Sequence, residues 1–104
     1  MEYDVVVTPE AEADLDRHIL YLLIEKCNEQ AAKSVLDDFE ITLNSLKRVA
    51  ASLKYCENPK LKALGYRRIN FHYHRYFMMY RICDGRVYVD SIFHELQDYE
   101  SCMV

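Results

Sequence analysis

A regular apolar stripe in the middle of the chain limits the folds open to this sequence more than any other feature. Its apolar side chains recur in steps of three and four, the spacing of one face of an α-helix. The stripe comprises Ala32, Val35, Leu36, Phe39, Leu43, Leu46, Ala50 and Leu53. It predicts a helix over about residues 29–52, with Asn28 as its N-terminal cap.

A second amphipathic helix precedes this one. Thr8 is a suitable cap, Pro9 fits the first helical position, and an apolar face follows at helical spacing, which predicts a helix over residues 9–26. A tight turn would join the two helices into a hairpin. The β-branched run before them, residues 3–7, predicts a short strand.

The second half of the chain has the pattern of strands. A basic loop punctuated by Pro59 spans residues 54–65, and strands are predicted over residues 66–71, 76–83 and 86–93. Asp84-Gly85 is a typical two-residue hairpin turn. The turn at residues 72–75 contains no Gly, Pro or Asn, so turn chemistry does not explain its residues. The tail, residues 95–104, is short, mixed and compatible with a helix.

The element order β-α-α-β-β-β predicts an α+β domain over residues 1–104, with the helical hairpin on one face of a mainly antiparallel sheet. The first strand is expected at an edge of the meander or beside its last strand. No apolar run reaches the roughly 18–20 residues of a membrane span, and the N-terminus lacks a signal peptide, so a cytoplasmic protein without membrane contact is expected. The four cysteines are widely spaced, which favours reduced thiols over a metal site.

The charge of the chain is unevenly distributed. Residues 1–50 hold eleven acids and five bases, whereas residues 54–86 hold eight bases and two acids. An anionic partner facing one surface would explain this pattern, and so would helices that are acidic outside and strands that are basic. The acidic run Asp37-Asp38-Glu40 is interpreted as the solvated face of the second helix.

Arginine and histidine residues are the candidates for chemistry. Arg67 and Arg68 are adjacent on one strand, so at least one of them must point away from the helices. That face, expected to be open, could hold a polynucleotide, or it could be an ordinary half-exposed sheet. His72, His74 and His94 could act in acid–base catalysis, bind a metal, or make ordinary hydrogen bonds; His18 is interpreted as structural.

Four segments together resemble the RelE/ParE toxin superfamily, the plasmid-stabilisation proteins. The chain opens with residues 5–15 (VVVTPEAEADL), continues with residues 65–69 (GYRRI) and 76–82 (YFMMYRI), and closes with residues 87–99 (VYVDSIFHELQDY). The resemblance implies the toxin of a bacterial type II toxin–antitoxin module, held inactive by a cognate antitoxin protein. Members of the superfamily either cut mRNA on the ribosome without a metal or cofactor, or inhibit DNA gyrase.

The ribonuclease branch is the leading hypothesis and assigns roles to particular residues. Its expected catalytic residues are Arg68, His74, Arg75 and His94. Its expected substrate-binding residues are Lys54, Lys60, Lys62, Arg67, Tyr76, Arg81 and Tyr99. This mechanism requires the guanidinium and imidazole groups to converge on one concave patch.

One departure leaves the branch open. Some ribonuclease members carry an Arg where this chain has Phe77, and the overall acidity is unlike that of basic ribosome-binding toxins. A gyrase inhibitor needs no catalytic residues and is the alternative, together with a non-toxic partner protein of the same fold.

Overall fold

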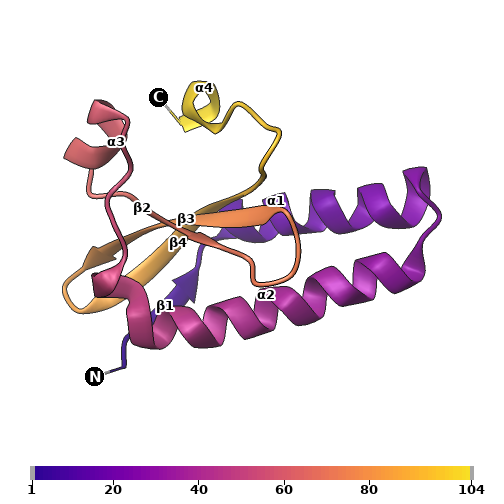
Figure 1. The fold of residues 1–104 in the computed structure, drawn as a ribbon, viewed down its shortest axis with the longest axis horizontal. Helices are drawn as coiled ribbons and strands as arrows, with labels where there is room; N and C mark the ends of the chain where they lie inside the picture. Colours follow the sequence, from indigo (N-terminus) through magenta and orange to yellow (C-terminus); the bar gives the residue numbers. More distant parts are fainter. Residues whose placement is uncertain (1, 104) are drawn as a thin grey trace.

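The computed structural model describes residues 2–103, so Met1 and Val104, the ends of the predicted domain, lie outside it. The chain folds around one four-stranded sheet with helices on both sides (Figure 1). The strands are β1 (Asp4–Val7), β2 (Arg67–Asn70), β3 (Tyr76–Cys83) and β4 (Arg86–His94). The helices are α1 (Pro9–Leu20), α2 (Glu29–Val49), α3 (Pro59–Ala63) and α4 (Tyr99–Met103), with a π-helical turn η1 (Tyr21–Glu25) and a 3₁₀ turn η2 (Ala50–Ser52).

The sheet has the order β1-β4-β3-β2. Strand β1 runs parallel to β4, whereas β4, β3 and β2 form an antiparallel meander. The predicted α+β fold and the place of the first strand beside the last one are therefore confirmed. A bulge between Met79 and Tyr80 shifts the register of β3 against β4, so that Met79 faces Ser91 while Tyr80 faces Val89. Asp90 is the additional residue at this bulge.

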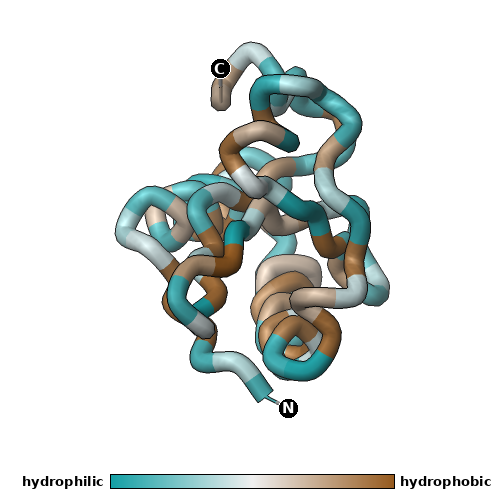
Figure 2. Tube along the Cα trace, turned by 90° about the vertical axis from the view of Figure 1, so that its left-hand side faces the viewer, coloured by the Kyte–Doolittle hydropathy of each residue, from teal (hydrophilic) through white to brown (hydrophobic). Residues whose placement is uncertain are grey.

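The helical hairpin covers one face of the sheet, as predicted (Figure 1). Apolar residues of α1 and α2 pack there against Ile69, Met78 and Tyr80. In Figure 2, hydrophobic and hydrophilic residues alternate around α2, which is seen end-on near the bottom, as expected of a helix with one buried face. The predicted helix of residues 9–26 is regular only to Leu20 and continues as η1.

The opposite face of the sheet is not open, and that expectation is wrong. Helices α3 and α4 lie over it (Figure 1), and a second apolar cluster fills the space beneath them. The cluster consists of Cys56, Leu61, Phe77, Met79 and Phe93, with Tyr66, Tyr99 and Met103 packed against it. The predicted basic loop contains α3 because the Asn58 side chain accepts hydrogen bonds from the Lys60 and Leu61 amides, and Pro59 occupies the first helical turn.

Candidate functional site

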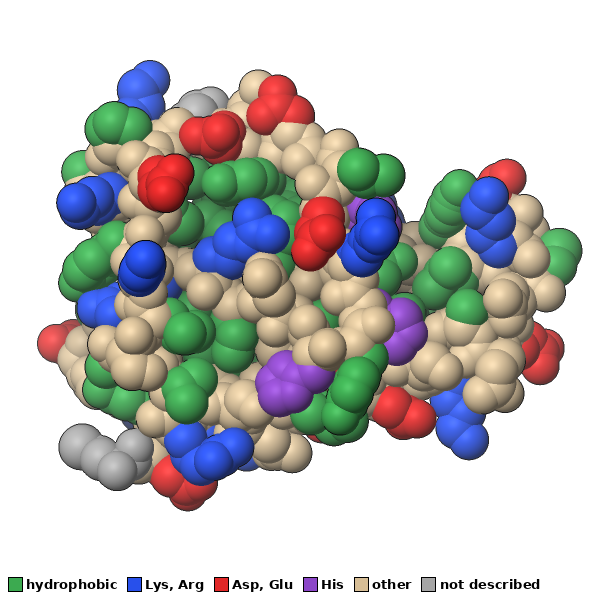
Figure 3. Space-filling model, in the orientation of Figure 1, with side chains coloured by type: hydrophobic (Ala, Val, Ile, Leu, Met, Phe, Trp, Pro, Cys, Tyr) green, Lys and Arg blue, Asp and Glu red, His purple; other side chains and the backbone are tan. Residues whose placement is uncertain are grey.

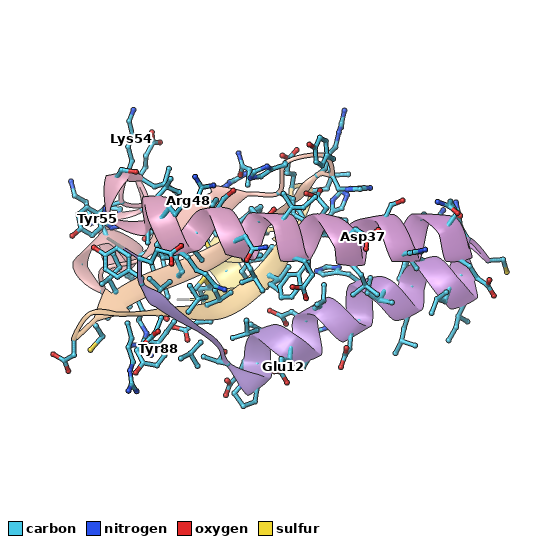
Figure 4. All side chains as sticks on the ribbon, turned by 90° about the horizontal axis from the view of Figure 1, so that it is seen from below. Glu12, Asp37, Arg48, Lys54, Tyr55 and Tyr88 are labelled. Carbon is cyan, nitrogen blue, oxygen red and sulfur yellow. The ribbon has the colours of Figure 1, made fainter. Side chains whose placement is uncertain are left out.

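Arg68 occupies a cleft on the face covered by α3 and α4. Its guanidinium carbon lies 3.7 Å from the centroid of the Phe77 ring and 6.0 Å from that of Tyr99, and its Nε donates to Asn70 Oδ1 at 2.8 Å. The cleft measures about 340 Å³ and is lined by Leu53, Lys54, Tyr55, Cys56, Glu57, Arg68, Asn70 and Tyr99. It thus unites three predicted residues, Lys54, Arg68 and Tyr99. Figure 4 shows Lys54 and Tyr55 at the same end of the molecule.

Two other predicted arginines are already engaged within the chain. Arg67 points to the other face, where its Nη1 donates to the carbonyls of Ala51 (2.8 Å) and Leu53 (2.6 Å) beyond the end of α2. Arg81 pairs with Asp90 at 2.8 Å, and this hydrogen bond raises its pKa. Both guanidinium groups therefore already have hydrogen-bond partners within the chain.

Lys60 and Lys62 are exposed on α3. In Figure 3, several Lys and Arg side chains crowd the end of the molecule that carries α3, whereas the histidines lie nearer its middle. The predicted substrate-binding lysines thus belong to this basic end of the surface.

His94 lies in a separate pocket, on the face of the sheet that α1 and α2 cover. Tyr76 stands between two imidazoles, with ring centroids 5.1 Å from His94 and 4.9 Å from His18 of α1. Leu96 N–H donates to His94 Nδ1 at 3.2 Å, so the neutral ring carries its proton on Nε2. This pocket of about 560 Å³ is lined by Arg17, His18, Tyr21, Leu22, Lys26, Tyr76, His94, Leu96 and Gln97.

His74 and Arg75 lie in the β2–β3 turn, which is fixed by a carboxylate of α2. Asp38 is 1% exposed and accepts three hydrogen bonds from the turn, from His72 N–H (3.0 Å), Tyr73 N–H (2.9 Å) and His74 Nδ1–H (2.7 Å), and a fourth from Thr42 Oγ1 on its own helix (3.5 Å). Burial opposes ionisation of Asp38, but these hydrogen bonds outweigh it and lower its pKa.

The predicted solvation of Asp38 is therefore wrong. Its neighbour Asp37 is exposed, as expected (Figure 4). Consecutive positions on a helix differ by about 100°. Asp38 therefore faces the interior of the molecule, whereas Asp37 faces water.

The four residues predicted to be catalytic do not share one patch. Arg68 stacks on Phe77 in the cluster beneath α3 and α4, whereas His94 makes an edge-to-face contact with Tyr76, which packs against the core beneath α1 and α2. These rings stand on opposite faces of β3, because Tyr76 and Phe77 are adjacent along the strand. His74 is tied to Asp38, and Arg75 is exposed in the turn. Among residues 2–103, no three His, Cys, Asp or Glu side chains lie close enough together to hold a metal ion.

The family follows from comparison with known proteins. The model of the "ParE toxin of type II toxin-antitoxin system, parDE" matches residues 5–99. The chain belongs to the ParE toxin family. The predicted membership of the RelE/ParE superfamily is thereby confirmed.

Solved structures carry the same fold as this ParE-family chain. A protein of the chromosomal ParDE system of P. aeruginosa superposes with a TM-score of 0.70 at 19% identity, over 89% of this chain and 96% of that one. A chain of the toxin–antitoxin complex RelBE2 from Mycobacterium tuberculosis gives a TM-score of 0.57 at 21% identity, over 90% and 99% of the two chains. No curated protein sequence matches the chain.

Sequence reasoning missed two residues that shape the sites of this ParE-family chain. Asp38 fixes the β2–β3 turn, and a turn without Gly, Pro or Asn was the available sign that a distant group must hold it. His18, predicted to be structural, makes a hydrogen bond to the Ile92 carbonyl and also lines the pocket of His94. Burial lowers the pKa of His18, although its Nε2 hydrogen bond to the Ile92 carbonyl, at 3.0 Å, acts in the opposite sense.

None of the helices within residues 2–103 is both long and apolar enough to cross a membrane.

Proposed function

We propose that this ParE-family toxin arrests growth by binding a protein target, DNA gyrase, and does not cleave RNA. The observation that carries the proposal is the placement of Arg68 and His94 on opposite faces of the sheet. Cleavage by a ribose 2′-hydroxyl needs a base, an acid and a cation around one phosphate. A single phosphate cannot contact groups that a β-sheet separates. Inhibition by binding has no such requirement, and it accords with the ParE family model.

A metal-independent, ribosome-associated mRNA endoribonuclease is the second candidate. The cleft that joins Arg68 to Lys54 and Tyr99 favours it, because two cations and an aromatic ring can hold a phosphate and a base. This mechanism would have to take its proton donor from a group other than His94. It therefore predicts that replacement of Arg68 abolishes toxicity, whereas replacement of His94 does not.

A cognate antitoxin is the second partner that we propose. The two solved relatives come from toxin–antitoxin systems. The end of the helical hairpin exposes large apolar side chains that a partner could cover, namely Leu20, Tyr21, Leu23 and Ile24. A small DNA-binding protein encoded beside this gene, which co-purifies with the chain, would support the module.

Two assays in parallel distinguish the candidates. The purified toxin is added to gyrase in a supercoiling assay and to ribosomes translating a defined mRNA, each with and without the antitoxin. The proposal expects loss of supercoiling, intact message and relief by the antitoxin. Cleaved message with unaffected supercoiling would instead establish the ribonuclease.

A further inference from the structure

The β2–β3 turn is held by hydrogen bonds to α2 in addition to those within the turn itself. Its ends are joined by the hydrogen bond from Phe71 N–H to the Tyr76 carbonyl, at 2.9 Å. Three donors of the turn converge on the buried carboxylate of Asp38, and Ser45 Oγ on the same helix lies 3.1 Å from His72 Nε2. Burying a carboxylate is costly unless hydrogen-bond donors satisfy it. The buried Asp38 carboxylate of α2 therefore requires the turn to keep the conformation that presents its three donors.

The side chain displayed by the turn is large and exposed. Tyr73 is 75% exposed, although both its neighbours in sequence are bonded to α2. The Tyr73 amide donates to Asp38, so the backbone beneath the ring is fixed while the ring faces solvent. A tyrosine on a rigid backbone offers a large contact area and loses little conformational entropy on binding.

One permanently charged cation is exposed beside Tyr73. Arg75 is exposed in the same turn, the Asp38 carboxylate bonded to the turn is buried, and the exposed acid Glu95 follows β4. The carbonyl of Arg75 accepts from Glu95 N–H at 2.9 Å, which ties the turn to the segment after β4. Leu96, the residue after Glu95, is 84% exposed, so a second apolar side chain is exposed in the segment that is bonded to the turn.

We propose that Tyr73 and Arg75 form the surface by which this toxin recognises its protein target, with Tyr73 entering an apolar pocket of the target and Arg75 pairing with an acidic rim. The inference rests on the proposed function and specifies which surface performs it. Interface hot spots are rich in Tyr and Arg. A nucleic acid backbone would require a row of cations, whereas this turn carries only one permanently charged group. An antitoxin helix or strand laid along a helical or sheet face would not need a fixed, protruding ring.

The test compares exposed positions at the two ends of β2. Tyr73→Ala and Arg75→Glu alter the proposed surface, whereas Leu64→Ala removes an exposed apolar side chain beside α3. Each variant is purified in the full chain, its folding is checked by thermal unfolding, and its inhibition of gyrase supercoiling is titrated. We expect Tyr73→Ala to weaken inhibition by about 30-fold or more, Arg75→Glu by about tenfold or more, and Leu64→Ala to match the wild type.

The outcomes separate the two claims. If the wild type inhibits gyrase and Tyr73→Ala inhibits equally well, the recognition surface is overturned while the proposed function stands. If the folded wild type has no effect on gyrase, the proposed function fails and this inference fails with it. Weaker inhibition by both turn variants, with unchanged thermal unfolding, would support both claims. RNA cleavage that depends on Tyr73 would overturn the choice of a protein partner.

Discussion

Two turns of the same antiparallel meander are built in opposite ways. The turn between β3 and β4 is made by its own residues, because Asp84 and Gly85 both adopt positive φ, 51° and 76°, which Asp tolerates and Gly adopts freely. The turn between β2 and β3 has no such residues and takes its shape from Asp38, a carboxylate 34 residues before His72 in sequence. Local chemistry therefore shapes one turn, and tertiary contact shapes the other.

The largest expected effect comes from removing the tertiary support. Asp38→Ala leaves the His72 and Tyr73 amides and the His74 ring without their acceptor, and we expect it to lower the free energy of unfolding by about 3 kcal/mol. The measurement is urea unfolding at neutral pH. Asp37→Ala is the matched control on the same helix and should stay within about 0.5 kcal/mol of the wild type. Equal losses in both variants would mean that Asp38 does not hold the turn.

Lowering the pH should decrease the free energy of unfolding by less than Asp38→Ala does. The pKa of Asp38 is lowered in the folded chain, so its contribution to stability is present above the unfolded pKa of about 3.9 and is lost as pH falls through the lower folded value. Below about pH 4 the free energy of unfolding should therefore fall more steeply in the wild type than in Asp38→Asn. Urea unfolding between pH 6 and pH 3 makes the comparison. Parallel pH profiles would contradict it.

The smallest effect is expected at the locally shaped turn. Gly85→Ala meets no atom within 4 Å, so its cost is confined to the left-handed backbone conformation, about 1 kcal/mol. Asp84→Asn keeps a residue that tolerates this conformation and should change the free energy of unfolding by less than about 0.5 kcal/mol. A cost for Gly85→Ala as large as that for Asp38→Ala would erase the difference between the two turns.

The same contrast explains what the sequence could and could not predict. The helical hairpin, the four strands and the turn at residues 84–85 follow from short-range patterns, and the structure confirms them, although the first helix is regular only to Leu20 and the predicted basic loop contains α3. The cover over the second sheet face could not be predicted in this way, because it depends on Tyr99 and Met103 of the tail packing against Phe77. These contacts join segments that no periodicity connects.

In the candidate site, too, local patterns predicted some features, and tertiary contacts determined the others. Strand alternation correctly places Arg67 and Arg68 on opposite faces of β2. Whether the predicted catalytic groups converge depends on tertiary contacts, which strand alternation does not determine. In the structure, Arg68 and His94 lie on opposite faces of the sheet. The burial of Asp38 was missed because an acid on a helix is usually solvated and its partners lie on another element.

The most direct test of the proposed mechanism is the toxicity of a chain that lacks both separated groups. The double variant Arg68→Ala/His94→Ala is induced in growing cells, with its folding verified by thermal unfolding and its antitoxin binding by co-purification. A toxin that acts by binding its target through the β2–β3 turn should still arrest growth and leave messages intact. Loss of growth arrest in a folded, antitoxin-binding double variant would contradict this account and return the function to RNA cleavage.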